Sequence, residues 1–146
     1  MYRSPLDSRA FRERGSLDIY IATALVLPLL LLTLFGGMAA LHLAELSTDV
    51  AFAAQVGSET AALAGGVTPF VSHSVSQSLA DAGLTVQPWV SGPAPSVPWG
   101  QPMTITVRVN VPLQGFPFTL VGLAGTTVQF GEQEVVDSEA VAPAAP

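Results

Sequence analysis

The sequence of 146 residues contains no cysteine and no lysine, and beyond residue 14 its only arginine is Arg108. Without cysteine, the chain cannot form a disulfide or a thiolate metal site. Charged residues make up 11% of the chain, whereas soluble domains usually contain about 25%. This deficit indicates that part of the chain does not face water.

The few charges are divided unevenly about Gly15. Four arginines and two acids precede this glycine, whereas one arginine and nine acids follow it. Phosphate recognition needs clustered cations, so the acidic main body is not expected to bind nucleic acid. The sequence also has only two histidines, no glycine-rich phosphate loop and no nucleophile-elbow motif. We therefore expect no enzymatic activity, no cofactor and no metal site.

The longest uncharged run extends from Ile19 to Ala44. As a helix it would rise about 39 Å, which is enough to cross a hydrocarbon core of about 30 Å. The excess of arginine before the run predicts a cytoplasmic N-terminus and an extracytoplasmic C-terminal domain. We therefore expect a single-pass membrane protein that contacts lipid through this run.

Two alternatives to a retained anchor are open. A removable secretory signal would end in a small-x-small cleavage site, which "GGMAALHLA" could supply, although its apolar region is usually only about 7–15 residues long. A buried helix of a soluble domain is disfavoured, because a chain of this size could not easily cover a helix that is apolar on all sides.

A ridge of small residues lies within the run. Gly36, Ala40 and Ala44 are spaced four apart, so they share one face of a helix. Such ridges allow membrane helices to approach each other closely. These three positions are therefore candidate assembly contacts.

Small side chains continue beyond the apolar run. The stretch 45–64 contains no proline and precedes Gly65 and Gly66, which predicts that the same helix continues to about residue 64. A long helix with a small-residue surface is hard to bury alone, so we expect it to pack against copies of itself or a related helix. Ala54 and Gly57 are the candidate contacts in this part.

A second, shorter helix is predicted over 68–83. Thr68 suits its N-cap, Pro69 its first turn and Gly83 its end. Apolar residues recur every four positions between them, at Val71, Val75 and Leu79, and these predict one buried face.

The C-terminal half changes to a period of two. The segment 103–111 alternates apolar and polar residues without a break, which predicts a strand with one buried face. The segment 84–90 is a weaker strand, which Pro88 places at an edge. The segment 126–136 is a third strand, in which Gly131 interrupts the alternation as a bulge would.

These elements predict an α+β fold: a long transmembrane helix extending into an extracytoplasmic helix, a second short helix, and a small three-stranded antiparallel sheet laid against the helices. Across the sheet, Arg108 is expected to face Glu132 or Glu134. The expected divisions are a basic cytoplasmic leader at 1–15, the transmembrane helix at 16–44, an extracytoplasmic helical stalk with the second short helix at 45–83, the sheet domain at 84–137 and a disordered tail at 138–146.

The connection between the last two strands, 113–125, is unusually apolar for a loop. It either folds over the sheet to complete a small core, or presents an apolar patch to a neighbouring protein or to the bilayer. The candidate partner-facing residues are Phe116, Phe118, Leu120 and Leu123.

Three stretches resemble the TadE-like proteins of the tight-adherence (Flp-type) pilus systems. These are "RERGS" before the apolar run, "ALVLPLLLLTLFG" within it, and "GQPMTITVRVNVPL…GLAGTTVQFGEQEVV" near the end. The resemblance covers most of the chain and implies a pilin-like fold. It also implies a minor pilin or pseudopilin that is anchored by its N-terminal helix and takes part in pilus assembly.

The same resemblance implies that a prepilin peptidase cleaves the leader between Gly15 and Ser16. Pilins usually carry Glu five residues after the cut, where this chain has Tyr20, and the nearest acid is Asp18. Both are candidate assembly contacts, and the missing Glu favours an accessory subunit. The implied partners are other pilin-like subunits and proteins of the pilus assembly platform. The alternative is a single-pass anchor that displays an extracytoplasmic binding module unrelated to pili.

Overall fold

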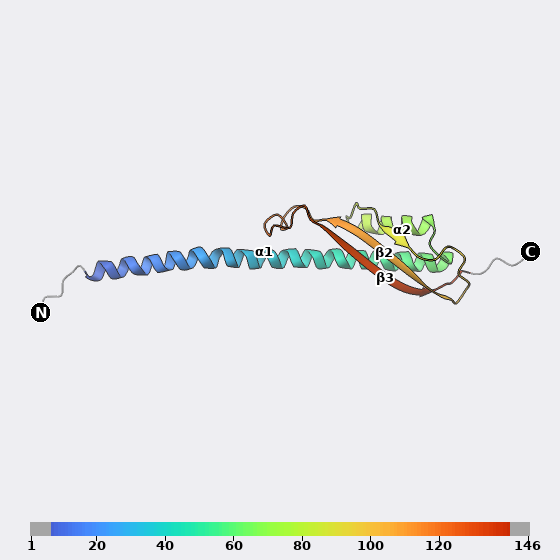
Figure 1. The fold of residues 1–146 in the computed structure, drawn as a ribbon, viewed down its shortest axis with the longest axis horizontal. Coiled ribbons are helices and arrows are strands. Elements are labelled where there is room, and N and C mark those ends of the chain that lie inside the picture. The colour runs from blue at the N-terminus through green and yellow to red at the C-terminus, as the bar shows by residue number, and fades with distance from the viewer. Residues whose placement is uncertain (1–6, 141–146) are drawn as a thin grey trace, which may run out of the picture.

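The computed structural model describes residues 7–140, with side chains from Ile19 onward. It contains a long N-terminal helix, a short second helix and a three-stranded antiparallel sheet (Figure 1), so the predicted α+β layout is confirmed. The elements are α1 (Asp7–Ala64), α2 (Pro69–Asp81), β1 (Trp89–Ser91), β2 (Pro102–Pro112) and β3 (Thr127–Asp137).

Helix α1 is continuous over 58 residues and includes Pro28. Its end follows the prediction. Gly65 adopts a φ of 70°, and the amides of Gly65 and Gly66 donate to the carbonyls of Ala62 and Ala61 at 3.3 and 3.0 Å. These are the two hydrogen bonds of a Schellman motif, which needs a left-handed residue that glycine adopts without strain.

Helix α2 begins and ends as its sequence predicts. The Thr68 hydroxyl accepts a hydrogen bond from the Val71 amide at 3.3 Å, with Pro69 in the first turn. The predicted apolar stripe is completely buried, at Val71, Val75 and Leu79. The stripe therefore fixes which face of α2 meets the rest of the protein.

The sheet has the order β1-β2-β3, with the long strand β2 in the centre. Strands β2 and β3 pair one to one over their whole length, with Arg108 opposite Gly131 and Val107 opposite Glu132. The bulge predicted at Gly131 is therefore wrong. The interrupted alternation has another cause: Glu132 and Glu134 occupy half-buried positions on the inner face, where the pattern led us to expect apolar residues.

The expected pairing of Arg108 with Glu132 or Glu134 is also wrong. Successive residues of a strand point to opposite faces, and Arg108 lies on the outer face whereas both glutamates lie on the inner one. Its guanidinium instead stacks over the ring of Trp89, 5.3 Å from the centroid. Trp89 belongs to β1, which is only three residues long and begins after Pro88.

The core lies between the inner face of the sheet, helix α2 and the C-terminal part of α1. From β2 it receives all five predicted residues: Met103, Ile105, Val107, Val109 and Val111. From α1 it receives residues between Ala39 and Ala62. We call this unit the head: α1 from Ala39 onward, α2, the sheet and the connections between them. Figure 1 shows the N-terminal part of α1 projecting from the head as a single helix.

The sheet lies against both helices of the predicted stalk at 45–83, and the apolar faces of these helices share one core with it. The start of the predicted disordered tail is wrong. Ser138 is buried, its hydroxyl donates to the Val97 carbonyl at 2.9 Å, and the Glu139 amide donates to the Ala62 carbonyl at 2.9 Å. The rest of that predicted tail, 141–146, lies outside the described residues.

Candidate assembly and membrane surfaces

The first candidate surface is the projecting part of α1. Every residue from Ile19 to Leu34 is exposed, and from Ile19 the helix is long and apolar enough to cross a membrane. We call residues 19–34 the free half of α1. Tyr20 lies there, 74% exposed. Of the other candidate leader positions, Gly15, Ser16 and Asp18 lie in the helical backbone of α1, and their side chains are outside the described part of the chain.

The predicted small-residue ridge lies where the free half meets the head. Ala40 and Ala44 are exposed and Gly36 is half-buried. Nothing lies within 4 Å of the position that a Cβ on Gly36 would occupy. The ridge is therefore not used in packing the head, and another helix has access to it.

Ala54 and Gly57, predicted to contact another subunit, are buried inside the head instead. Ala54 is 1% exposed, and a Cβ on Gly57 would lie 2.6 Å from a Val75 methyl group and 3.9 Å from a Val107 methyl group. These small residues allow α1 to approach α2 and β2 closely. The expectation that they face a neighbour is wrong, because the chain covers this part of α1 with its own second helix and sheet.

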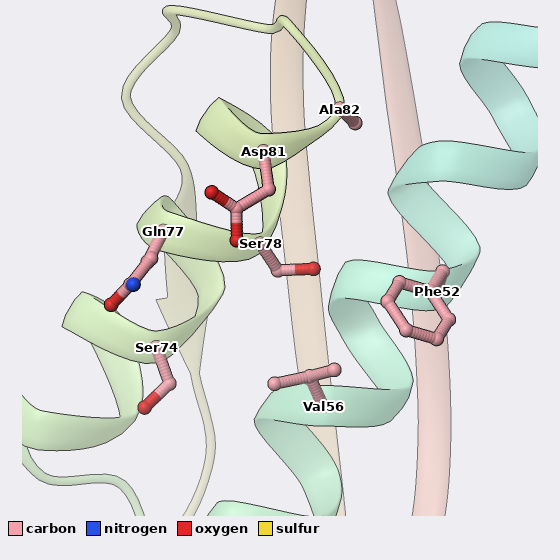
Figure 2. A pocket seen from close by; sticks show the side chains of 7 residues that line it. All are labelled: Phe52, Val56, Ser74, Gln77, Ser78, Asp81 and Ala82. Atoms are coloured by element: carbon pink, nitrogen blue, oxygen red, sulfur yellow. The ribbon is translucent and has the colours of Figure 1, made fainter.

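A groove between α1 and α2 was not predicted. Its open volume is about 510 Å³. Figure 2 shows Phe52 and Val56 projecting from α1. From α2 it shows the side chains of Ser74, Gln77, Ser78 and Asp81. Phe52 is 61% exposed, and the buried hydroxyl of Ser78 has no hydrogen-bond partner among the described residues. The signal that could have found this groove is Phe52, a large side chain within a stretch of small ones.

The connection from Leu113 to Thr126, which we call the β2–β3 loop, divides between the two expected roles. Phe118 is 2% exposed and joins the core, so its expected contact with a partner is wrong. Phe116, Leu120 and Leu123 are exposed. The loop lies alongside α1 (Figure 1), where the Phe116 ring meets the Phe35 ring edge-on at 5.3 Å between centroids. The loop therefore completes the core and also presents an apolar surface.

The outer face of the sheet is a polar surface. Gln87, Asn110 and Gln129 surround the stacked pair of Trp89 and Arg108 and line a shallow hollow of about 310 Å³. Helices α1 and α2 contribute no residue to it. This face offers amide groups, one aromatic ring and one cation to a small ligand.

Within residues 19–140, no three His, Asp or Glu side chains are grouped so that they could hold a metal ion. His73 is exposed on α2. His42 lies 3.3 Å from Glu45 through Nδ1 and Oε2, and its ring stands 5.5 Å from that of Phe118. Both histidines therefore occupy surface positions.

Comparisons of the chain with protein-family models, with curated proteins and with solved structures gave no significant match.

Proposed function

We propose that this protein is a membrane-anchored, minor pilin-like subunit of the TadE-like kind. It takes part in the assembly of a tight-adherence or type IV-like pilus, or of a related secretion apparatus. The uncharged run of α1, which begins with the free half, crosses the membrane from a cytoplasmic N-terminus, and the head lies on the extracytoplasmic side. Its partners are membrane lipid, other pilin-like subunits and the proteins of the assembly platform, with a prepilin peptidase acting on the leader.

The observation that carries this proposal is the division of α1 into two halves. One half is exposed along its whole length, and the other forms part of the head's core. A bare apolar helix is stable in lipid or against other apolar helices, but not in water. A subunit of this shape can be stored in a membrane and also packed helix to helix in an assembly.

The ridge of Gly36, Ala40 and Ala44 is the proposed contact with a neighbouring helix. It is open in the isolated subunit, and small residues lower the distance at which two helices can pack. Tyr20, in place of the usual Glu, supports an accessory rather than a repeated subunit.

Intact-mass measurement of the membrane-extracted protein tests whether the leader is cleaved. A mature chain that begins at Ser16 is the expected result. A chain that retains Met1 would contradict processing by a prepilin peptidase. A chain that begins beyond residue 40 would instead establish a removable secretory signal.

Co-purification with pilus components tests the assembly role. We expect Ala40→Leu and Ala44→Leu to weaken it several-fold while membrane insertion and the folding of the head are unchanged. The matched control is Leu34→Phe, which adds volume at an exposed position on a different face of the same helix. Equal effects of the ridge variants and the control would argue against the ridge as the contact.

The alternative is a membrane-anchored binding module unrelated to pili. The outer sheet face favours it, because Trp89, Arg108 and the neighbouring amides form a polar hollow on the side away from the helices. In that case Gln129→Ala and Asn110→Ala would abolish ligand binding, whereas the ridge variants would have no effect. The presence of genes for a prepilin peptidase and a secretion ATPase nearby would favour the pilus role.

A further inference from the structure

The β2–β3 loop has an apolar surface that its role in the core leaves unexplained. No charged residue occurs anywhere between Arg108 and Glu132. Three large apolar side chains of the loop remain exposed, at 61%, 53% and 39%: Phe116, Leu120 and Leu123. An exposed apolar patch of this kind marks a contact with a protein or a membrane.

The position of the loop along α1 decides between these two occupants. Phe116 packs against Phe35, which lies within the uncharged run that begins at Ile19. At 1.5 Å per residue, Phe35 is about 24 Å along the helix from Ile19, within a hydrocarbon core of about 30 Å. The polar pair of His42 and Glu45 follows at about 35 Å or more by the same rise, at the depth of the headgroups. At the depth of Phe35, lipid acyl chains surround the protein.

Part of the loop's backbone is hydrogen-bonded within the protein. Non-helical backbone at membrane depth needs its polar groups bonded within the protein, because no water is present to bond them. Within the loop, the amides of Leu120 and Leu123 donate to the carbonyls of Pro117 and Phe118 at 3.0 and 2.9 Å, and Thr119 donates to Gly115. The amides of Leu113 and Gly125 close its base, at 2.8 and 2.9 Å from the carbonyls of Thr126 and Leu113.

The two threonine hydroxyls of the loop are bonded in the same way. Thr119 Oγ1 donates to the Gly115 carbonyl at 3.1 Å, and Thr126 Oγ1 donates to the Leu123 carbonyl at 2.7 Å. These bonds satisfy part of the loop's backbone and both of its hydroxyl groups, while Phe116, Leu120 and Leu123 remain exposed.

We propose that the β2–β3 loop inserts into the membrane leaflet on the side of the head, beside α1, as a second membrane contact. The acyl chains of that leaflet cover Phe116, Leu120 and Leu123. This rests on the proposed membrane insertion of α1. Two contacts on one body restrict its rotation and tilt, so the head sits directly on the membrane with a fixed orientation of the ridge.

The absence of cysteine allows a direct test in the full chain, because each introduced cysteine is the only labelling site. The protein is reconstituted in phosphatidylcholine vesicles with an NBD fluorophore at Leu120→Cys or Leu123→Cys. Leu31→Cys, in the free half, is the lipid-exposed reference, and Gln133→Cys, exposed on β3, is the water-exposed reference. Quenching by an acyl-chain nitroxide is compared with quenching by iodide in the buffer.

We expect the probes at 120 and 123 to emit at shorter wavelength than the probe at 133. We also expect several-fold stronger quenching by the nitroxide than by iodide, as at 31. Values like those at 133, with the probe at 31 still quenched by the nitroxide, would overturn the inserted loop and leave the anchor intact. A probe at 31 that iodide quenches would instead overturn the membrane insertion of α1, and the inserted loop with it.

A second variant checks that contact with lipid, rather than the attached fluorophore, determines where the β2–β3 loop lies. Leu120→Asp in the Leu123→Cys protein should shift the probe toward the water-exposed values, because a carboxylate is costly in hydrocarbon. Leu63→Asp, at a leucine of α1 that is 69% exposed at the far end of the head, is the matched control and should leave the probe unchanged. Equal responses to the two aspartates would overturn the proposal.

Discussion

The two halves of α1 belong to one unbroken helix but use different side chains. From Ile19 to Leu34 the helix is dominated by leucine and other large apolar residues, and all of them are exposed. From Ala39 to Ala64 alanine is the commonest residue, and one face is buried. The free half therefore exposes a large apolar surface, whereas the half inside the head has small side chains that allow other elements to pack closely against it.

In the proposed membrane-anchored protein, this difference follows from what surrounds each half. Lipid chains are fluid and adapt to any side chain, so a lipid-facing helix needs apolar area but no fitted shape. The interior of the head is close-packed, so the side chains of α1 must be complementary in shape to those of α2 and β2. At Gly57 the fit leaves no room for even one methyl group. Substitutions of the same type in the two halves should therefore have very different costs.

Truncation of a leucine to alanine should give the largest difference in stability between the two halves of the comparison, the head and the free half. Leu79 is fully buried where α2 meets the core, so Leu79→Ala should lower the free energy of unfolding by about 2–5 kcal/mol. Leu30 is 55% exposed in the free half, and Leu30→Ala should leave the stability of the head unchanged. Guanidinium titration in detergent, followed by tryptophan fluorescence, measures this, because both tryptophans, Trp89 and Trp99, lie in the head. Equal losses in the two variants would contradict the division of α1.

Replacement of a buried glycine by leucine should give the next largest loss of stability. Gly57→Leu places a side chain where Val75 already lies, and such overpacking costs about 1–3 kcal/mol. Gly37→Leu is the matched control, since nothing lies within 4 Å of a Cβ at that position and leucine forms helix better than glycine. The same titration separates the two variants. A tolerated leucine at 57 would show that α1 and α2 can separate without loss of stability.

Removal of one buried hydroxyl should have a smaller effect. Ser138 Oγ donates to the Val97 carbonyl at 2.9 Å and links the end of β3 to the connection before β2, beside the C-terminal end of α1. Ser138→Ala leaves that carbonyl without this donor and should cost about 1 kcal/mol. Ser96→Ala, at an exposed serine of the same connection, should cost nothing measurable. A neutral Ser138→Ala would mean that this end of the head contributes little to its stability.

The fold could be predicted from the sequence wherever one local pattern decides the outcome. Leucine content and the uncharged run identified a helix long and apolar enough to cross a membrane. Gly65 and Gly66 identified its end, and strict alternation identified the core face of β2. Each of these signals depends on neighbouring residues alone. The order of the elements along the chain then favoured a small antiparallel sheet beside the helices.

The surfaces were harder to predict because they depend on which elements meet. Small residues at Ala54 and Gly57 indicate close packing, but not whether the partner is another subunit or the chain's own α2. Likewise Arg108 and Glu132 are both charged strand residues, and only the register places them on opposite faces. The β2–β3 loop divided between two roles because Phe118 points into the core whereas Phe116 packs beside Phe35.

The smallest expected effect concerns the outer sheet face, which is as uncovered as the free half of α1 but polar. There Arg108 stacks over Trp89 on the neighbouring strand at 5.3 Å. A cation–π contact at an exposed site contributes about 0.5–1 kcal/mol, so Arg108→Met should lower the free energy of unfolding by no more than this amount. Arg108→Lys keeps a cation and should recover part of the loss. If Arg108→Met costs as much as Leu79→Ala, the outer face is part of the head's packing, and the contrast between covered and uncovered surfaces fails there.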